Sequence, residues 1–278
     1  MKFIKMHGIG NDYVYVDAFK ERVTHPVEFA VKVSHRRFGI GGDGLILIKP
    51  HAELDAEMEM YNLDGSLGEM CGNGLRCVAK YVHDTYHPGK NSLRFMTGAG
   101  LRSALITARD KDGKATKVQI DMGAPLFRGL EIPTTFDLPE VLRKTIEVDG
   151  KTFEFSAVSM GNPHCVLYVD DVKHFPVEKV GPLIECHPYF PKKINVEFIQ
   201  IVSPQEVIQR TWERGSGETW ACGTGASAVT AIGRRLGLTG DQLTIHLLGG
   251  DLKMEYDGVG SVLMEGAATE VFRGDIPD

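Results

Sequence analysis

Short stretches in which apolar and polar residues alternate recur along this 278-residue chain, and they predict many β-strands. In the first half the predicted strands cover residues 3–6, 13–17, 45–48, 57–61, 92–97 and 103–108. In the second half they cover residues 144–148, 153–158, 165–169, 195–202, 206–211, 244–248, 252–256 and 261–265. Strands therefore supply most of the predicted regular structure.

Four other segments are predicted to be helices, and they are residues 26–34, 74–81, 177–186 and 225–236. Pro26 suits a first helical turn, and Arg234 and Arg235 followed by Gly237 suit a helix C-terminus. Because strands outnumber helices, the expected fold class is α+β, in preference to a doubly wound parallel sheet.

Two glycine-flanked cysteines occupy matching places in the two halves. Cys71 opens the run Cys71-Gly72-Asn73-Gly74, and Cys222 opens Cys222-Gly223-Thr224-Gly225, 151 positions later (222 − 71). Each run leads into a predicted helix. Prolines and glycines gather at residues 123–139, the best candidate for a domain junction. The pattern predicts a duplicated fold with one cysteine in each half.

A cysteine at a helix N-terminus has a particular chemistry. Unpaired backbone N–H groups and the helix dipole favour a thiolate there, and the same groups bind carboxylates. Glycines let a ligand approach the backbone closely. Two such sites facing one another would hold one carboxylate and place a sulfur on each face of the adjacent Cα. That arrangement suits moving a proton from one face of a carbon to the other.

The remaining cysteines and glycines allow simpler interpretations. Cys77, Cys165 and Cys186 are expected in the core, as isolated cysteines commonly are. The spacing of Cys71 and Cys77 does not match a structural zinc site. A disulfide between the two glycine-flanked cysteines would give an oxidised, inactive form. The residues that follow the glycines at 8–10 and 39–42 do not complete the pattern of a nucleotide-binding loop, so these glycines are interpreted as tight turns.

Composition narrows the class of protein further. The net charge is −6, from 31 basic and 37 acidic residues without long runs of either sign, which argues against a nucleic-acid surface. We expect no membrane span, because no apolar stretch is long enough, and no signal peptide at the N-terminus. Five thinly spread cysteines do not resemble a disulfide framework, so free thiols in the cytoplasm are expected.

Several motifs, taken together and in order, resemble the diaminopimelate epimerase family. They are residues 7–12 (HGIGND), 71–74 (CGNG), 161–164 (GNPH), 213–219 (ERGSGET) and 221–225 (ACGTG). The similarity extends over residues 1–274. Each motif alone is weak, whereas the full set is specific.

The resemblance implies a cofactor-independent and metal-independent epimerase that interconverts LL- and meso-2,6-diaminopimelate, for lysine and peptidoglycan precursors. It implies a homodimer of chains with two pseudo-symmetric domains, each a β-barrel-like sheet wrapped around a central helix, with the active site in the cleft between them. The domains are expected at residues 1–118 plus 267–278, carrying Cys71, and at residues 119–266, carrying Cys222.

Family roles carry over to individual residues. Cys71 and Cys222 are the catalytic residues implied, with Cys71 accepting and Cys222 donating the proton from LL to meso. His164 and Glu213 are expected to tune the thiol pKa values. The implied substrate-binding residues are Asn11, Asn62, Gly72, Asn73, Asn162, Asn195, Glu213, Arg214, Gly223 and Thr224. Arg214 suits a carboxylate and Glu213 an ammonium group; without the resemblance, Asn62 reads as an ordinary turn residue.

Two positions depart from the family pattern. Gly44 stands where some members have a substrate-contacting glutamine, and Phe272 where some have a dimer-interface tyrosine. Two alternatives remain open: a related two-cysteine racemase acting on proline, hydroxyproline or histidine, which would not need Glu213 and Arg214 for a second amino-acid end, and a non-enzymatic thiol redox or metal-binding protein.

Overall fold

The structure is a computed structural model that describes residues 1–276. The chain forms two compact units. We call Met1–Asp121 together with the chain from Glu265 onward the Cys71 unit, and Met122–Met264 the Cys222 unit. One strand, β17 (Leu263–Ala267), contains the second boundary between them.

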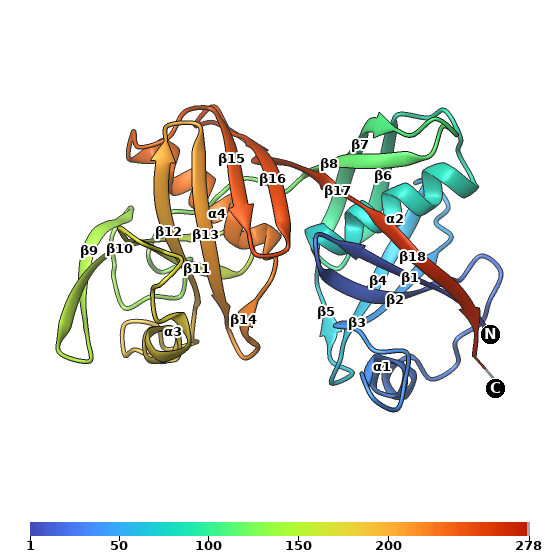
Figure 1. Cartoon of the computed structure of the whole chain (residues 1–278), viewed down its shortest axis with the longest axis horizontal. Helices are drawn as coiled ribbons and strands as arrows, with labels where there is room; N and C mark the ends of the chain where they lie inside the picture. The colour runs from blue at the N-terminus through green and yellow to red at the C-terminus, as the bar shows by residue number, and fades with distance from the viewer. Residues whose placement is uncertain (277–278) are drawn as a thin grey trace. The chain divides into compact units, whose positions relative to one another are not determined.

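The Cys71 unit is a sheet wrapped around a helix (Figure 1). Its strands are β1 (Lys2–Gly8), β2 (Asn11–Asp17), β3 (Gly44–Lys49), β4 (Ala56–Asn62), β5 (Leu67–Gly68), β6 (Ser92–Thr97), β7 (Gly100–Arg109), β8 (Ala115–Asp121) and β18 (Thr269–Asp275). They pair in the order β18–β1–β2–β3–β4–β6–β7–β8, and the β2/β3 and β4/β6 pairs are parallel. Helix α2 (Gly72–Thr85) contacts β1, β2, β4, β7 and β8, and α1 (Pro26–Ser34) contacts β2, β3 and β4.

The Cys222 unit repeats this plan. Its strands are β9 (Val141–Val148), β10 (Lys151–Ser159), β11 (Pro163–Tyr168), β12 (Asn195–Ser203), β13 (Glu206–Glu213), β14 (Gly217–Thr219), β15 (Gln242–Leu247) and β16 (Gly250–Glu255). They pair in the order β9–β10–β11–β12–β13–β15–β16, and the third and fourth strands (β11/β12) and the fifth and sixth (β13/β15) are again the parallel pairs. Helix α4 (Gly223–Arg235) contacts β10, β11, β12 and β16, and α3 (Val177–Glu185) contacts β9, β12, β13 and β14.

Both central helices are almost fully enclosed, as their residues dictate. Helix α4 consists mostly of Gly, Ala, Ser, Thr and Val, which are small enough for strands to pack closely around it, and ten of its thirteen residues are buried. Helix α2 is bulkier but equally enclosed, with Leu75, Cys77, Val78 and Ala79 fully buried. Each unit also has an apolar cluster of its own, around Phe3 and Leu45 or around Phe155 and Phe198. The predicted α+β class with two similar halves is confirmed.

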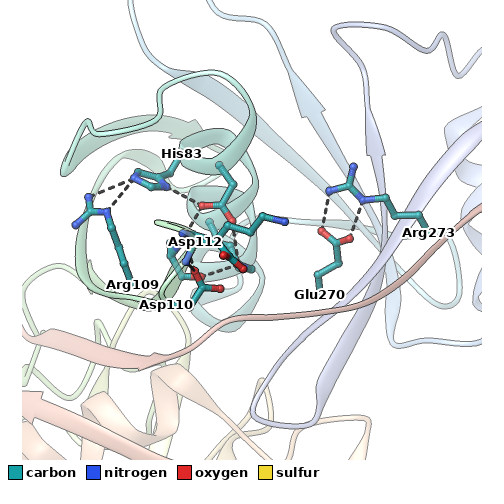
Figure 2. Close-up of polar contacts among 10 residues, drawn as sticks. His83, Arg109, Asp110, Asp112, Glu270 and Arg273 are labelled. Carbon is teal, nitrogen blue, oxygen red and sulfur yellow. Dashed lines mark hydrogen bonds and ion pairs between the residues drawn. The ribbon is translucent and has the colours of Figure 1, made fainter.

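The C-terminal end of α2 is fastened by a polar network (Figure 2). His83 Nδ1 lies 2.7 Å from Asp84 Oδ1, and its Nε2 lies 3.2 Å from Arg109 Nη2 on β7. Asp84 also accepts from Lys80 Nζ at 2.9 Å and from the Ala115 N–H at 2.9 Å. The helix is thereby tied to the β7–β8 hairpin, and this fixes the axis that presents Cys71 at its other end.

The predicted helices all form, with ends that differ by up to four residues. Two longer strands were missed, β8 and β18, as were the short β5 and β14. None of the helices within residues 1–276 is both long and apolar enough to cross a membrane.

Candidate active site

Cys71 and Cys222 are the N-cap residues of the two central helices. Both have extended backbone conformations, and both accept a hydrogen bond at Sγ from the backbone N–H three residues on, Gly74 or Gly225, at 3.3 Å. Sulfur here replaces the oxygen that usually caps a helix. Gly72 and Asn73, and likewise Gly223 and Thr224, form the first turn that follows each sulfur.

Asn11 is the residue brought against Cys71. The β1–β2 hairpin closes through Ile9 and Gly10, whose φ values of 47° and 90° are those of a tight two-residue hairpin turn, and Asn11 follows immediately. Its Oδ1 lies 3.2 Å from Cys71 Sγ, so the thiol donates to the amide oxygen. Its Nδ2 donates to Asp43 Oδ2 at 2.7 Å, which fixes which way the amide faces.

Asp43 belongs to a cluster of charges behind Asn11. Arg36 pairs with Asp43 at 2.8 Å and with Asp12 at 2.7 Å, and Lys5 bonds Asp12 at 2.5 Å. Burial and the neighbouring Asp12 charge raise the pKa of Asp43, whereas burial of Asp12 is outweighed by Arg36 and Lys5, which lower its pKa. The cluster holds the start of β2 and the start of β3 together.

A longer chain of contacts leads away from Cys222. Its Sγ lies 3.5 Å from Thr224 Oγ1, which accepts from Asn162 Nδ2 at 3.2 Å. Asn162 Oδ1 lies 3.0 Å from His164 Nε2. His164 Nδ1 in turn lies 2.8 Å from Glu197 Oε1. Predicted site residues from β11, from the loop before it and from α4 are thus joined into one network.

Glu197 is a residue of this network that the sequence analysis missed. It and His164 are 0% exposed, and it also accepts from Gln209 Nε2 at 2.8 Å and Thr211 Oγ1 at 2.5 Å. A Cβ on Gly225 would lie 2.5 Å from Glu197 Oε1, so glycine is needed there for the carboxylate to sit against the helix start. A charged residue inside the otherwise apolar run Val196–Ile199 was the available signal.

The environment of Cys222 overturns one expectation from the sequence. Burial, followed by the charges of Glu213 and Glu197, raises the pKa of the Cys222 thiol well above its ordinary value. The Thr224 hydroxyl and the Gly225 N–H oppose this rise but do not outweigh it. At Cys222 the expected effect of the helix start in favour of a thiolate is therefore outweighed by burial and by these two charges.

The remaining predicted residues of the Cys222 unit lie at the start of β12 and in or next to the 213–219 loop. Asn195 is buried, donating to the Pro163 carbonyl at 2.8 Å and accepting from the Arg214 N–H at 2.9 Å, so it sets the backbone of the 213–219 loop. Arg214 is exposed and donates to the Lys192 carbonyl at 3.2 Å. Glu213 accepts from Thr219 Oγ1 at 2.6 Å.

Asn62 ends β4 and takes part in a turn. Its Nδ2 donates to Ser66 Oγ at 2.9 Å, the ordinary turn role that its sequence context predicts. Gly44, the departure from the family pattern, is explained by the fold: a Cβ there would lie 2.0 Å from the Tyr61 carbonyl oxygen across the β3–β4 pair. This backbone excludes any side chain at residue 44.

All five cysteines are free thiols. Cys77 and Cys165 are in the core as expected, but Cys186 is exposed at the C-cap of α3, so the prediction for it is wrong. Over residues 1–276, His, Cys, Asp and Glu side chains do not gather in any group of three or more that could hold a metal ion.

Comparison with known proteins gives a consistent result. The diaminopimelate epimerase family model matches residues 3–127 and 156–271. Proteins named diaminopimelate epimerase are 48% identical in Acetivibrio thermocellus (277 residues, 99% of this chain and 98% of the relative) and 48% identical in Leptospira biflexa (277 residues, 99% of each). Among solved structures, a PhzF-family phenazine biosynthesis protein of Bacillus anthracis matches with a TM-score of 0.73 at 16% identity, covering 100% of this chain and 99% of that one.

A hydroxyproline epimerase of Agrobacterium vitis, solved with trans-4-hydroxy-L-proline, matches with a TM-score of 0.65 at 16% identity over 99% of this chain and 90% of that one. These two structures share the fold. The duplicated fold with a helix-capping cysteine in each half, together with the family match, defines an isomerase. More narrowly, the chain belongs to the diaminopimelate epimerase family.

Proposed function

We propose that this protein interconverts LL- and meso-2,6-diaminopimelate by a cofactor-independent proton transfer between two thiols, in the supply of lysine and peptidoglycan precursors. The observation that carries the proposal is the pair of cysteines capping the two central helices in a chain 48% identical to proteins of that name. In this proposal each unit is one epimerase half, carrying Cys71 or Cys222.

The reaction follows from the groups at each helix start. Backbone N–H groups at the starts of α2 and α4 bind the carboxylate of the reacting end. One thiolate removes the α-proton, and the other thiol gives its proton to the opposite face of the same carbon. The charge that develops next to the carboxylate is stabilised by the same N–H groups. One thiolate and one thiol remain afterwards, in exchanged positions.

The two directions of reaction use the cysteines in opposite roles. From LL to meso, Cys71 is the acceptor and Cys222 the donor. The raised pKa of Cys222 supports this assignment, because burial and the Glu213 charge keep its proton in place until it is needed. Glu213 and His164 are the residues we propose to tune the two thiols.

The second amino-acid end of the substrate needs its own partners. Arg214, exposed and anchored by its backbone to Asn195, is suited to a bidentate grip on the distal carboxylate, and Glu213 to an ammonium group. The complete set that we propose to bind substrate is Asn11, Asn62, Gly72, Asn73, Asn162, Asn195, Glu213, Arg214, Gly223 and Thr224.

Substitution of each cysteine tests the mechanism. We expect Cys71→Ser and Cys222→Ser each to abolish epimerisation with circular dichroism unchanged, because a serine hydroxyl is far less acidic than a thiol. In deuterium oxide, wild-type protein should introduce deuterium at the α-carbon during turnover. Full activity in either serine variant would exclude the two-thiol mechanism. A panel including proline, hydroxyproline and histidine tests the substrate, and turnover of one of these without diaminopimelate would exclude the proposed specificity.

A homodimer in the cytoplasm is the assembly and location we propose. Val271 and Phe272 on β18 are exposed apolar side chains, with Phe272 47% exposed although its ring packs edge-on against Phe3. Five free thiols suit a reducing compartment. Light scattering should give twice the chain mass, and Phe272→Glu should reduce it to the monomer value; a wild-type monomer would reject the dimer.

A further inference from the structure

Glu185, the last residue of α3, is a buried carboxylate, 5% exposed, that accepts from three donors. Its Oε2 accepts from Trp212 Nε1 at 2.8 Å, and its Oε1 accepts from the Gly215 N–H at 3.1 Å and from Lys193 Nζ at 3.2 Å. Burial by itself would raise the pKa of Glu185, but these three bonds outweigh it and lower the pKa. The side chain is therefore a carboxylate at neutral pH, with both oxygens in use.

Two of these donors, Trp212 and Gly215, stand on either side of Glu213 and Arg214. The bond to Trp212 fastens the end of β13 to α3, where the indole lies against the helix backbone: a Cβ on Gly181 would lie 2.6 Å from Trp212 Cγ. The bond to the Gly215 N–H fastens the turn between β13 and β14. One carboxylate thus holds the chain before and after the charged pair.

The backbone of Arg214 has a side-chain acceptor at each of its two peptide groups. The Arg214 N–H donates to Asn195 Oδ1 at 2.9 Å, and the next amide, that of Gly215, donates to Glu185. The guanidinium also donates to the Lys192 carbonyl at 3.2 Å. Fixing both peptide groups fixes the direction in which the Arg214 side chain leaves the turn.

The Cys71 unit has the same positions without the carboxylate. One separation relates the two units: it is 151 for the capping cysteines (222 − 71), for the last residues of β13 and β4 (213 − 62) and for the last residues of α3 and α1 (185 − 34). The matched residues are therefore Glu185 and Ser34, Trp212 and Tyr61, and Arg214 and Leu63. The buried carboxylate and the charged pair occur together in one unit, and both are missing from the other.

The turn of the Cys71 unit is held by its own side chains. Asp64 Oδ1 accepts from the Ser66 N–H at 2.9 Å, and Asn62 Nδ2 donates to Ser66 Oγ at 2.9 Å. Ser34 Oγ is buried, and among residues 1–276 it has no hydrogen-bond partner, so it takes no part in that turn. The fold therefore accepts a small residue at the end of this helix, and the external support from Glu185 is particular to the turn that carries Arg214.

We propose that Glu185 is a positioning residue for the substrate: by accepting from Trp212 and from the Gly215 N–H, it holds the β13–β14 turn so that Arg214 is directed at the distal carboxylate. The inference rests on the proposed function, in which Glu213 and Arg214 bind the second amino-acid end. Lys193, whose side chain is 54% exposed, balances the charge but adds little to the support.

The first test is the kinetics of Glu185→Gln. Its NH2 group replaces one acceptor oxygen by a donor, so either Trp212 or Gly215 loses its acceptor. We expect KM for diaminopimelate to rise about tenfold with kcat within about twofold of wild type, because the grip on the distal end acts in the ground state and transition state alike. If wild-type protein epimerises diaminopimelate and Glu185→Gln has a wild-type KM, the positioning role is overturned while the proposed function stands.

The second test needs no substrate. Hydrogen exchange at the Gly215 amide and the Trp212 indole N–H, followed by NMR, reports the two bonds directly. In Glu185→Gln at least one of these protons should exchange about tenfold faster than in the wild type. Wild-type rates at both would overturn the proposal. Because no turnover is involved, this measurement decides whether Glu185 holds the turn even if the protein does not act on diaminopimelate.

Two single variants serve as controls. Asp17→Asn alters another buried carboxylate, in the Cys71 unit, that accepts from Tyr81 and Tyr86, and KM should remain at the wild-type value. Lys193→Gln removes the ion pair alone and should change KM by less than about twofold. A tenfold rise in either control would overturn the proposal, because a general loss of stability or of the ion pair would then account for the effect.

A double variant copies the other half of the molecule. Glu185→Ser/Trp212→Tyr introduces the residues that occupy the matched places in the Cys71 unit, Ser34 and Tyr61, and leaves the Gly215 amide without its acceptor. It should fold, as circular dichroism would show, and raise KM as much as Glu185→Gln does. A wild-type KM in this variant would contradict the proposal, also in the event that Glu185→Gln does not fold.

Discussion

The surroundings of Cys71 and Cys222 share a backbone and differ in charge. Each sulfur caps a central helix in the same way, and each helix start lies near a hairpin asparagine. Beneath α2 lies Ile46, whereas beneath α4 lies Glu197. The last residue of β4 is the neutral Asn62, and the last of β13 is the anionic Glu213. A duplicated fold thus supplies equivalent positions, and substitutions within it make the two thiols unequal.

Glycine at the third helical position should reveal this difference most strongly. We expect Gly225→Ala to destabilise the protein by about 3 kcal/mol, because the new methyl group displaces the Glu197 carboxylate from its donors. Gly74→Ala should cost only about 1 kcal/mol, because it meets the end of the Ile46 side chain. Chemical denaturation of both variants measures the contrast, and helix propensity cancels between them. Equal losses would mean that the two sites are equivalent.

Asp43 tests the corresponding support on the Cys71 side. Removing its carboxylate in Asp43→Ala frees the Asn11 amide to turn, so Asn11 Oδ1 no longer faces Cys71. We expect kcat/KM to fall about tenfold, as for loss of one hydrogen bond to a charged group. Glu57→Ala is the control, since Glu57 pairs with Lys49. A fall in both variants alike would show that general loss of surface charge is responsible.

The charge of Glu213 should account for part of the pH behaviour of Cys222. A raised thiol pKa means that the protonated form persists to higher pH; removing a cause of the rise lowers the pKa and increases the thiolate fraction at a given pH. Glu213→Gln should therefore speed Cys222 alkylation at neutral pH about fivefold. The reaction is measured in a Cys71→Ser/Cys186→Ser background, where the other two thiols, Cys77 and Cys165, are 0% exposed and Cys222 is 5% exposed. A slower reaction would refute the sign.

Asn62 should give the smallest effect on stability. Asn62→Ala removes its bond to Ser66 Oγ and should lower the free energy of unfolding by about 0.5 kcal/mol, because the turn is exposed. Thermal denaturation measures this, with Ser66→Ala as the matched partner variant. If Asn62 acts only in the turn, both variants will have the same activity; a larger activity loss in Asn62→Ala would assign it to substrate.

Local features of the sequence were enough to predict the helices and most strands. The helix starts follow from cysteine followed by glycine, and apolar alternation located strands such as β3 and β4. Strand β18 was not predicted because its side chains are mostly polar or exposed, and because its pairing with β1 joins residues at opposite ends of the chain. Strand β8 has alternating Val118 and Ile120 but a short, lysine-flanked pattern.

Part of the site, like strand β18, could not be predicted from local sequence patterns. Cys71, Cys222 and the motifs around them could be found. Glu197 was marked only as a charge inside the apolar run Val196–Ile199, and its burial follows from the covering of β12 on both faces by α3 and α4. The pKa of Cys222 was misjudged because the helix start is local, whereas the burial and the charges of Glu213 and Glu197 that outweigh it come from strands of the folded unit.

The pairing of β1 with β18 has a consequence for how the chain is made. The first strand of the Cys71 unit leaves the ribosome long before its partner, whereas every strand of the Cys222 unit lies within the intervening segment. The Cys222 unit can complete its sheet while the Cys71 unit still has an open edge at β1. The edge of β1 is therefore the surface most in need of protection during synthesis. A chain whose synthesis stops before β18 would expose this unpaired, aggregation-prone edge.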